Sequence, residues 1–177
     1  SLYAFSTENW IRPKTEIKGL WELVHYFFDA KREIFESSKI RVMHSGSLKG
    51  IPKVTQNTIK EVVDHTKKNK DFTLNLCINY GGRQDIIQAV NTWLENRKGD
   101  KKLTMKSIEK YLYTNSLPQV DLLIRTSGEY RISNYLLWQI AYSELVFTDV
   151  LWPDFSPNHL YQSIYEFQQR ERRYGGI

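Results

Sequence analysis

The stretch that decides the fold is 121–155, DLLIRTSGEYRISNYLLWQIAYSELVFTDVLWPDF. It holds two short β-rich runs, 121–124 and 145–148, separated by a polar loop and by an apolar segment, 134–143, with helical spacing. A strand, a helix and a second strand in this order are typical of a parallel strand pair joined by a crossover. The stretch therefore predicts an α/β fold.

The same alternation continues on both sides of this stretch. Further strands are predicted at 2–5, 40–44 and 72–78, and helices at 13–35, 53–69, 86–94, 104–113 and 157–172. Pro13 suits the first position of a helix, and Ile17, Trp21 and Phe28 follow at helical spacing. The sequence contains no repeat, low-complexity tract or interdomain linker. It predicts one domain, 1–177, with a mostly parallel central sheet flanked by helices.

Length and composition exclude several classes of protein. The 177 residues carry 25 Lys plus Arg against 20 Asp plus Glu, a net charge of +5, and 41% of them are hydrophobic. A chain of this size can bury a core without crosslinks, and a single cysteine, Cys77, excludes a disulfide scaffold. No stretch approaches the roughly 20 consecutive apolar residues that span a bilayer. We therefore expect a cytoplasmic protein.

Most of the unusual polar density lies directly after the predicted strands, where ligands bind in open α/β sheets. The segment 125–133 is the richest, with arginines and hydroxyls leading into a predicted helix start. Guanidinium groups, hydroxyls and free N–H groups suit a phosphate or diphosphate. The alternative is a capped helix start in which Glu129 pairs with an arginine. Arg12, in another segment that follows a strand, favours anion binding.

Other motifs narrow the chemistry. The sequence lacks GxGxxG and GxxxxGK[ST], which argues against dinucleotide and P-loop sites. Gly81-Gly82 after a strand is more typical of a tight turn than of a phosphate cradle. The four histidines lack metal-ligand spacing, so any metal would be a hard cation such as Mg²⁺, held by carboxylate and phosphate oxygens.

Aromatic residues raise two further questions. The predicted helix at 13–35 is apolar around more of its circumference than one packing face requires, which fits a thick core, a dimer face or an apolar tunnel. Trp10 lies in a polar loop beside Arg12, a position that suggests it covers a ligand or a partner.

Four motifs are distinctive when taken together: FSTENWIRP (5–13), NYGGR (79–83), the stretch 121–155 and RERRYGG (170–176). They resemble the cis-prenyltransferases, and most closely the bacterial undecaprenyl diphosphate synthases. The resemblance covers essentially the whole chain. It implies condensation of isopentenyl diphosphate with an allylic diphosphate, usually farnesyl diphosphate, with Mg²⁺ as cofactor. The product would be a long-chain polyprenyl diphosphate, expected here to be undecaprenyl diphosphate for the cell-wall lipid carrier.

The resemblance also implies roles for individual residues. The isopentenyl diphosphate head group would be bound by Arg125, Arg131, Ile132 and Ser133. The mobile substrate loop would contain Ser6, Thr7, Glu8, Trp10 and Arg12, and Asn9 is the catalytic position, labelled as proton acceptor in the family. A neutral amide is a poor base, so we interpret Asn9 as orienting the substrate while a diphosphate oxygen takes the proton.

Two further assignments concern the metal and the partner subunit. Glu144 matches a Mg²⁺ carboxylate of the family, although an ordinary surface glutamate is the simpler interpretation of the residue alone. Arg173 and Gly175 match an element that reaches the partner subunit's active site, which implies a homodimer. A polyprenyl product must reach a membrane, so we expect peripheral membrane contact, helped by basic residues.

One departure from the family pattern concerns the chemistry itself. The Asp-Gly-Asn-Gly-Arg motif, which supplies the family's catalytic aspartate, is absent from these residues. The chain also opens on an apolar run at 2–5, so we expect that N-terminal sequence is missing and that these residues alone are inactive. The alternatives are a non-catalytic partner subunit and a phosphate- or RNA-binding α/β module. Scattered basic charge argues against nucleic acid as a partner.

Overall fold

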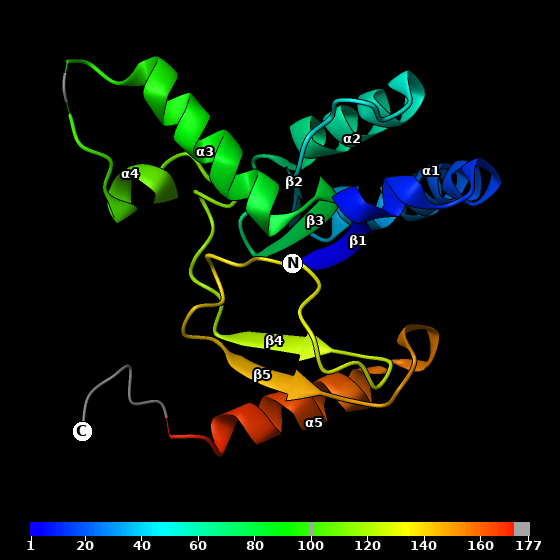
Figure 1. Cartoon of the computed structure of the whole chain (residues 1–177). Coiled ribbons are helices and arrows are strands. Elements are labelled where there is room, and N and C mark those ends of the chain that lie inside the picture. Colours follow the sequence, from blue (N-terminus) through cyan, green and yellow to red (C-terminus); the bar gives the residue numbers. More distant parts are fainter. Residues whose placement is uncertain (100, 172–177) are drawn as a thin grey trace. The chain divides into compact units, whose positions relative to one another are not determined.

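The computed structural model describes residues 1–99 and 101–171, excluding the side chains at positions 29, 31, 32 and 36. The chain forms two compact units, Ser1–Asn115 and Ser116–Ile177 (Figure 1). Each unit contains a parallel ladder of strands with helices, so the predicted α/β class with parallel strands is confirmed. The organisation of the chain as one catalytic domain stays a prediction.

The first unit is built on a three-stranded parallel sheet with the order β1-β3-β2. Its strands are β1 (Leu2–Ser6), β2 (Ile40–Ser45) and β3 (Phe72–Tyr80). β3 is the central strand of this sheet, which explains why its residues are buried continuously from Asn75 to Tyr80. The register places Val42 beside Leu74 and His44 beside Leu76, so these four side chains lie on the same face of the sheet.

Two long helices, α1 (Lys14–Ser37) and α2 (Lys53–Thr66), pack against each other and against β2. Each begins directly after a proline, Pro13 or Pro52, which stands at the N-cap. Pro13 thus lies one residue before the first helical position predicted for it. The last residue of α2, Thr66, accepts a hydrogen bond from the Val42 N–H at 2.9 Å. Val42 lies on an edge strand, so the buried hydroxyl of Thr66 satisfies a backbone donor at that edge.

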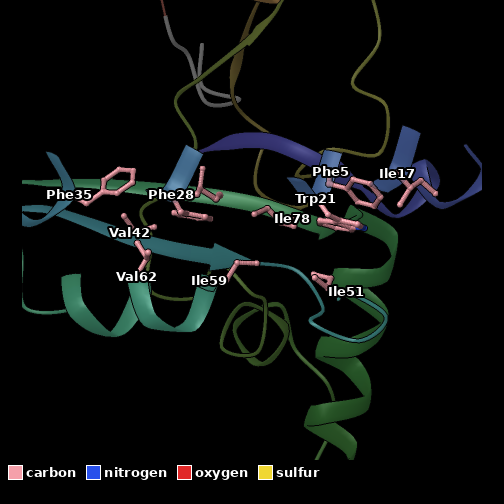
Figure 2. Packing of buried hydrophobic residues seen from close by; sticks show 11 residues of the cluster. Phe5, Ile17, Trp21, Phe28, Phe35, Val42, Ile51, Ile59, Val62 and Ile78 are labelled. Atoms are coloured by element: carbon pink, nitrogen blue, oxygen red, sulfur yellow. The ribbon is translucent and has the colours of Figure 1, made fainter. Parts of the chain in front are cut away.

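The predicted apolar spacing of α1 produces the core of this unit. Figure 2 shows the cluster between the helices and the sheet, with Phe5, Ile17 and Trp21 toward one end and Phe35 at the other. Side chains of α1, α2 and all three strands contribute to it. The members are Phe5, Ile17, Trp21, Phe28, Phe35, Val42, Ile51, Ile59, Val62, Leu76 and Ile78.

After β3 the chain continues into α3 (Gly82–Asn96) and the short α4 (Met105–Glu109). Thr104 caps α4 by accepting the Ser107 N–H at 3.1 Å. The helix predicted at 104–113 is therefore present but shorter than expected. It gives way to turns because the Tyr113 N–H donates to the Asp85 carboxylate at 3.0 Å instead of continuing a helical ladder.

The second unit contains a two-stranded parallel ladder of β4 (Leu122–Arg125) and β5 (Glu144–Phe147), with α5 (Pro157–Gln168) packed against both strands (Figure 1). The described residues also form two short 3₁₀ helices, η1 (Thr7–Ile11) after β1 and η2 (Trp152–Asp154) before α5. Among the residues described, no helix combines the length and apolar character needed to cross a membrane.

The helix predicted at 134–143 is wrong, because this segment forms a series of turns. Ser133, Asn134 and Leu136 have φ of 48°, 62° and 47°. Left-handed residues cannot belong to a right-handed helix, so they interrupt it where it would begin. The apolar spacing is explained instead by packing, since Leu136 is buried within the turns.

Candidate active site

The segment after β1 is stabilised by its own polar side chains. Asn9 Oδ1 accepts the Ser6 N–H at 2.8 Å, closing the first turn of η1. This bond fixes the orientation of the amide, and Nδ2 is a hydrogen-bond donor that could act on a ligand. Thr7 Oγ1 donates to Glu8 at 3.1 Å, and Arg12 pairs with Glu16 in α1. Side-chain hydrogen bonds and an ion pair therefore hold the predicted loop residues, 6–12, in a defined conformation.

Trp10 joins this segment to the core. Its ring centroid lies 5.3 Å from that of Phe5 and 5.7 Å from that of Trp21, and its Nε1 donates to Asn79 Oδ1 at 2.8 Å. The side chain remains 37% exposed. Packing against buried aromatic rings thus explains a tryptophan in this polar loop, in addition to the predicted role of covering a ligand or a partner. The sequence pattern alone does not indicate this packing.

The glycine pair that follows β3 serves the start of α3. Asp85, in the first turn of this helix, is buried and accepts hydrogen bonds from Tyr80 Oη, Gln88 Nε2 and the Tyr113 N–H, each at 3.0 Å. A buried carboxylate at the helix N-terminus repels a second anion there. The structure therefore favours a turn at Gly81-Gly82 over a phosphate cradle.

In the second unit, Arg125 ends β4 and carries the clearest signal for an anion. Its Nε is buried and has no hydrogen-bond partner among the residues described. Leaving a charged buried donor unpaired costs free energy, which an anionic ligand would recover. The loop after Arg125 returns to the end of β5, since the Ser127 N–H donates to Val150 O at 2.9 Å and the Gly128 N–H to Thr148 O at 3.0 Å.

Arg131 and Ser133 follow in the same loop. Arg131 pairs with Glu129 and keeps 63% of its side chain exposed, so it remains accessible to a ligand. This ion pair is the one expected for a capped helix start, yet the turns that follow are not a helix. Ile132 O accepts the Tyr135 N–H at 3.0 Å, which shapes the turn that contains Ser133.

Glu144, at the start of β5, is bound by Arg170, which follows α5. Arg170 Nη1 donates to Glu144 Oε2 and to Leu145 O, both at 2.9 Å, and Nη2 pairs with Glu166. Hydrogen bonds to the carboxylates of Glu144 and Glu166 raise the pKa of Arg170 above its ordinary value. Arg170 therefore competes with any cation for the Glu144 carboxylate.

A metal ion would therefore find one carboxylate at this position. Within residues 1–99 and 101–171, no group of three or more His, Cys, Asp or Glu side chains could hold a metal. A single carboxylate fits Mg²⁺ when phosphate oxygens and water supply its other ligands, as they do in many phosphate-transferring sites. Arg173 and Gly175, predicted to reach a partner subunit, lie outside the described residues.

The predicted residues thus form two groups, one in each unit. The first contains 6–12 and the second contains Arg125, Arg131–133 and Glu144. The family model described as putative undecaprenyl diphosphate synthase matches residues 1–175. The chain belongs to this prenyltransferase family. The cis-prenyltransferase activity expected from the motifs is therefore supported at the level of the family.

Curated members of the prenyltransferase family are similar over the whole chain. An isoprenyl transferase from Leptospira interrogans is 47% identical over 182 residues, which cover all of this chain and 76% of that protein. The isoprenyl transferase of Bacillus subtilis is 45% identical over 182 residues and is covered to 70%. The chain therefore spans about three quarters of the length of these relatives.

Solved structures of the prenyltransferase family have the same fold. A probable undecaprenyl diphosphate synthase from Campylobacter jejuni matches with a TM-score of 0.89 and 35% identity, covering 98% of this chain and 81% of that one. Lavandulyl diphosphate synthase from Lavandula x intermedia, in complex with dimethylallyl diphosphate, matches with a TM-score of 0.92 and 30% identity, covering 98% and 77%.

Sequence reasoning missed Asn79 and Arg170. Asn79 begins the NYGGR motif, in which the glycine pair drew attention away from the asparagine. Its contact with Trp10 joins residues that are 69 positions apart, so no local spacing indicates it. Arg170 lies in a basic run whose pairing with Glu144 likewise depends on the tertiary structure.

Proposed function

We propose that this protein condenses isopentenyl diphosphate with an allylic diphosphate, such as farnesyl diphosphate, to form undecaprenyl diphosphate or a similar long-chain product. The observation that carries this proposal is the buried, unpaired Nε of Arg125 at the carboxyl end of β4. Accessible Arg131 in the same loop supplies a second guanidinium for a diphosphate. The names of the related proteins support the same class of substrate.

In the second unit, the loop after β4 would hold the isopentenyl diphosphate. Arg125 and Arg131 would bind its oxygens, and the Ser133 hydroxyl would donate a further hydrogen bond. Arg131 would exchange its exposed pair with Glu129 for the diphosphate, a small loss because pairs exposed to water contribute little. Ile132 would contribute through its backbone.

In the first unit, the segment 6–12 would bind the allylic substrate. Asn9 Nδ2 and the side chains of Ser6, Thr7 and Arg12 would orient its diphosphate, while Trp10 would exclude water from the reacting carbon. During condensation the allylic C–O bond breaks and its electrons leave with the diphosphate. The isopentenyl double bond supplies the electrons of the new C–C bond, and the proton lost from it passes to a diphosphate oxygen.

We include Mg²⁺ in the proposal as a cofactor that neutralises the charge of the departing diphosphate. Among the described residues, Glu144 would supply the carboxylate that holds it. We also propose a homodimer, in which Arg173 and Gly175 reach the partner's site. We further propose peripheral contact with the cytoplasmic face of a membrane, and no nucleic-acid partner.

The test is incorporation of radiolabelled isopentenyl diphosphate into lipid, with farnesyl diphosphate and Mg²⁺. We would compare the 177-residue chain with a form extended at its N-terminus by a segment carrying the Asp-Gly-Asn-Gly-Arg motif. We expect activity in the extended form, because the motif supplies the family's catalytic aspartate. Failure of both forms would contradict the proposal and favour a non-catalytic subunit.

Arg125→Ala in the active form tests the site itself. We expect the KM for isopentenyl diphosphate to rise by about tenfold to a hundredfold, the effect of losing a charged hydrogen-bond donor to a ligand. Arg97→Ala is the matched control, because Arg97 is exposed and stacks 5.6 Å above the Trp93 ring. An unchanged KM in Arg125→Ala would refute the assignment.

A further inference from the structure

Asn79 connects three segments through one side chain. Its Nδ2 donates to Ser47 O at 2.8 Å and to Lys49 O at 3.0 Å, and its Oδ1 accepts from Trp10 Nε1 at 2.8 Å. Asn79 is only 6% exposed and lies one residue before the end of β3. Both amide hydrogens and the amide oxygen are thus used inside the protein.

The backbone at this point is shaped around Asn79. Asn79 has φ of 51°, a left-handed value that asparagine tolerates better than most residues. Its carbonyl accepts the Ser47 N–H at 3.1 Å. A Cβ added at Gly46 would lie 2.2 Å from Ile78 O and 2.9 Å from Asn79 O, so the segment that follows β2 passes directly over the end of β3.

Trp10 is the other end of this connection. Phe5 and Trp21 contact its ring, and the position of a Cβ at Gly50 is 3.7 Å from its Cζ2. Ring contacts restrain the plane of an indole but leave it able to slide, whereas a hydrogen bond at Nε1 sets its direction. The neighbouring Ile11 is 91% exposed, so Trp10 is the residue that attaches η1 to the core.

We propose that Asn79 is a positioning residue, which acts through Trp10 to hold the η1 segment in the geometry that binds the allylic diphosphate. The same amide attaches η1 to the 46–50 segment, so the two segments keep one geometry at the end of the sheet. The inference rests on the proposed function, because the substrate is that of the proposed reaction. Asn79 itself touches no reacting atom in this assignment.

The chemistry of asparagine is specific to this position. Asn79→Asp keeps an acceptor for Trp10 Nε1. It replaces the amide group, which donates to Ser47 O and Lys49 O, with a carboxylate oxygen that those carbonyl oxygens repel. Leucine has nearly the same shape and removes every hydrogen bond, but it tolerates the left-handed φ of residue 79 less well than asparagine or aspartate does. Trp10→Phe removes the donor from the other side and keeps an aromatic ring, and it leaves the buried Asn79 backbone untouched.

The first measurement follows the Trp10 indole N–H by ¹H–¹⁵N NMR, with its signal assigned by its loss in Trp10→Phe. Hydrogen-bonded N–H groups exchange slowly with solvent. We expect Asn79→Leu to accelerate exchange at Trp10 by about tenfold or more, the effect of losing one buried hydrogen bond. Asn96→Leu is the matched control, because Asn96 is exposed and donates only within its own helix, to Thr92 O at 2.7 Å.

The second measurement is kinetic and uses the active form of the enzyme. We expect Asn79→Leu to lower kcat/KM for farnesyl diphosphate by about tenfold to a hundredfold, a typical effect of displacing a binding group by an ångström. The KM for isopentenyl diphosphate should change little. Trp10→Phe/Asn79→Leu should be no worse than the more impaired single variant, since both act through one hydrogen bond.

These measurements separate the two proposals. If the unaltered enzyme incorporates no isopentenyl unit, the proposed function fails. If it is active and Asn79→Leu leaves kcat/KM for farnesyl diphosphate unchanged, or leaves Trp10 exchange unchanged, the positioning role is overturned. Should Asn79→Leu fail to fold, Asn79→Asp decides. Its carboxylate repels the Ser47 and Lys49 carbonyls that the amide now binds, so a loss in kcat/KM specific to farnesyl diphosphate is expected, and an unchanged value overturns the positioning role.

Discussion

At the scale of single residues, Glu144 carries the most direct prediction about the metal. Arg170 donates to its Oε2 at 2.9 Å, so a Mg²⁺ ion held by diphosphate would share the carboxylate with this arginine. We expect Glu144→Ala to raise the Mg²⁺ concentration for half-maximal activity by about tenfold or more, because the protein then contributes no carboxylate at this position. A magnesium titration of initial rates measures it.

The matched control is Glu166→Gln. Glu166 also pairs with Arg170 but belongs to α5 and not to the β5 edge, so its loss should leave the magnesium titration unchanged. If Glu144→Ala and Glu166→Gln shift the titration equally, the effect comes from releasing Arg170, and Glu144 is not a ligand.

At the scale of elements, two glycines should respond to alanine with opposite signs. Gly46→Ala places Cβ 2.2 Å from Ile78 O at a residue with φ of 131°, so β2 and β3 must separate there. Gly19→Ala lies within α1, is exposed and meets no atom within 4 Å. We expect Gly46→Ala to lower the free energy of unfolding by about 2 kcal/mol or more and Gly19→Ala to raise it by about 0.5–1 kcal/mol.

Urea unfolding followed by circular dichroism measures both glycine variants. A destabilised Gly19→Ala would contradict the helical environment assigned to it. A neutral Gly46→Ala would show that the close approach of the 46–50 segment to the end of β3 does not exist in solution, and it would also weaken the role proposed for Asn79.

At the scale of the whole molecule, His44 makes stability depend on pH. Burial lowers the pKa of His44 below its ordinary value of 6.5, an effect that its hydrogen bond to Ile78 O, at 2.9 Å, partly opposes. Below pH 6.5 the unfolded chain binds a proton that the folded protein binds less readily. The free energy of unfolding therefore falls as the pH falls below this value.

Urea unfolding at pH 7.5 and at pH 5.5 tests this dependence. His44→Gln keeps a side-chain donor for Ile78 O but cannot titrate, so it should reduce the loss of stability on acidification. His65→Gln, an exposed histidine in the last turn of α2, is the control and should leave the loss unchanged. Equal pH dependence in His44→Gln and in the unaltered protein would refute the assignment.

Much of the fold follows from local patterns. The strands were predictable because short runs such as 72–78 place apolar residues at every second position, and α1 because Ile17, Trp21 and Phe28 repeat along one face. The segment 134–143 shows the limit of this reasoning. Its residues have helical spacing, but the left-handed conformations at Ser133 and Asn134 break the helix, and no spacing rule reports a dihedral angle.

Some residues of the candidate site can also be identified from the sequence, whereas others are apparent only from the structure. Arg125 and Arg131 could be identified from sequence because chain order places them directly after a strand, where parallel sheets bind ligands. The hydrogen bond from the Ser6 N–H to Asn9 Oδ1 joins residues close in the chain, but it depends on the turn conformation, which the sequence pattern does not specify. The contacts of Asn79 with Trp10 and Ser47 join distant positions and have no sequence signature.

The sequence by itself determined the α/β class, the family and which arginines are candidates to bind a diphosphate, because strand and helix periodicity and contiguous motifs are properties of neighbouring residues. Only the tertiary structure decided that Asn79 holds Trp10, that Arg170 binds Glu144 and that Asp85 closes the start of α3. Each of these depends on a hydrogen bond with a reach of about 3 Å. Folding must bring the partners that close before the bond exists.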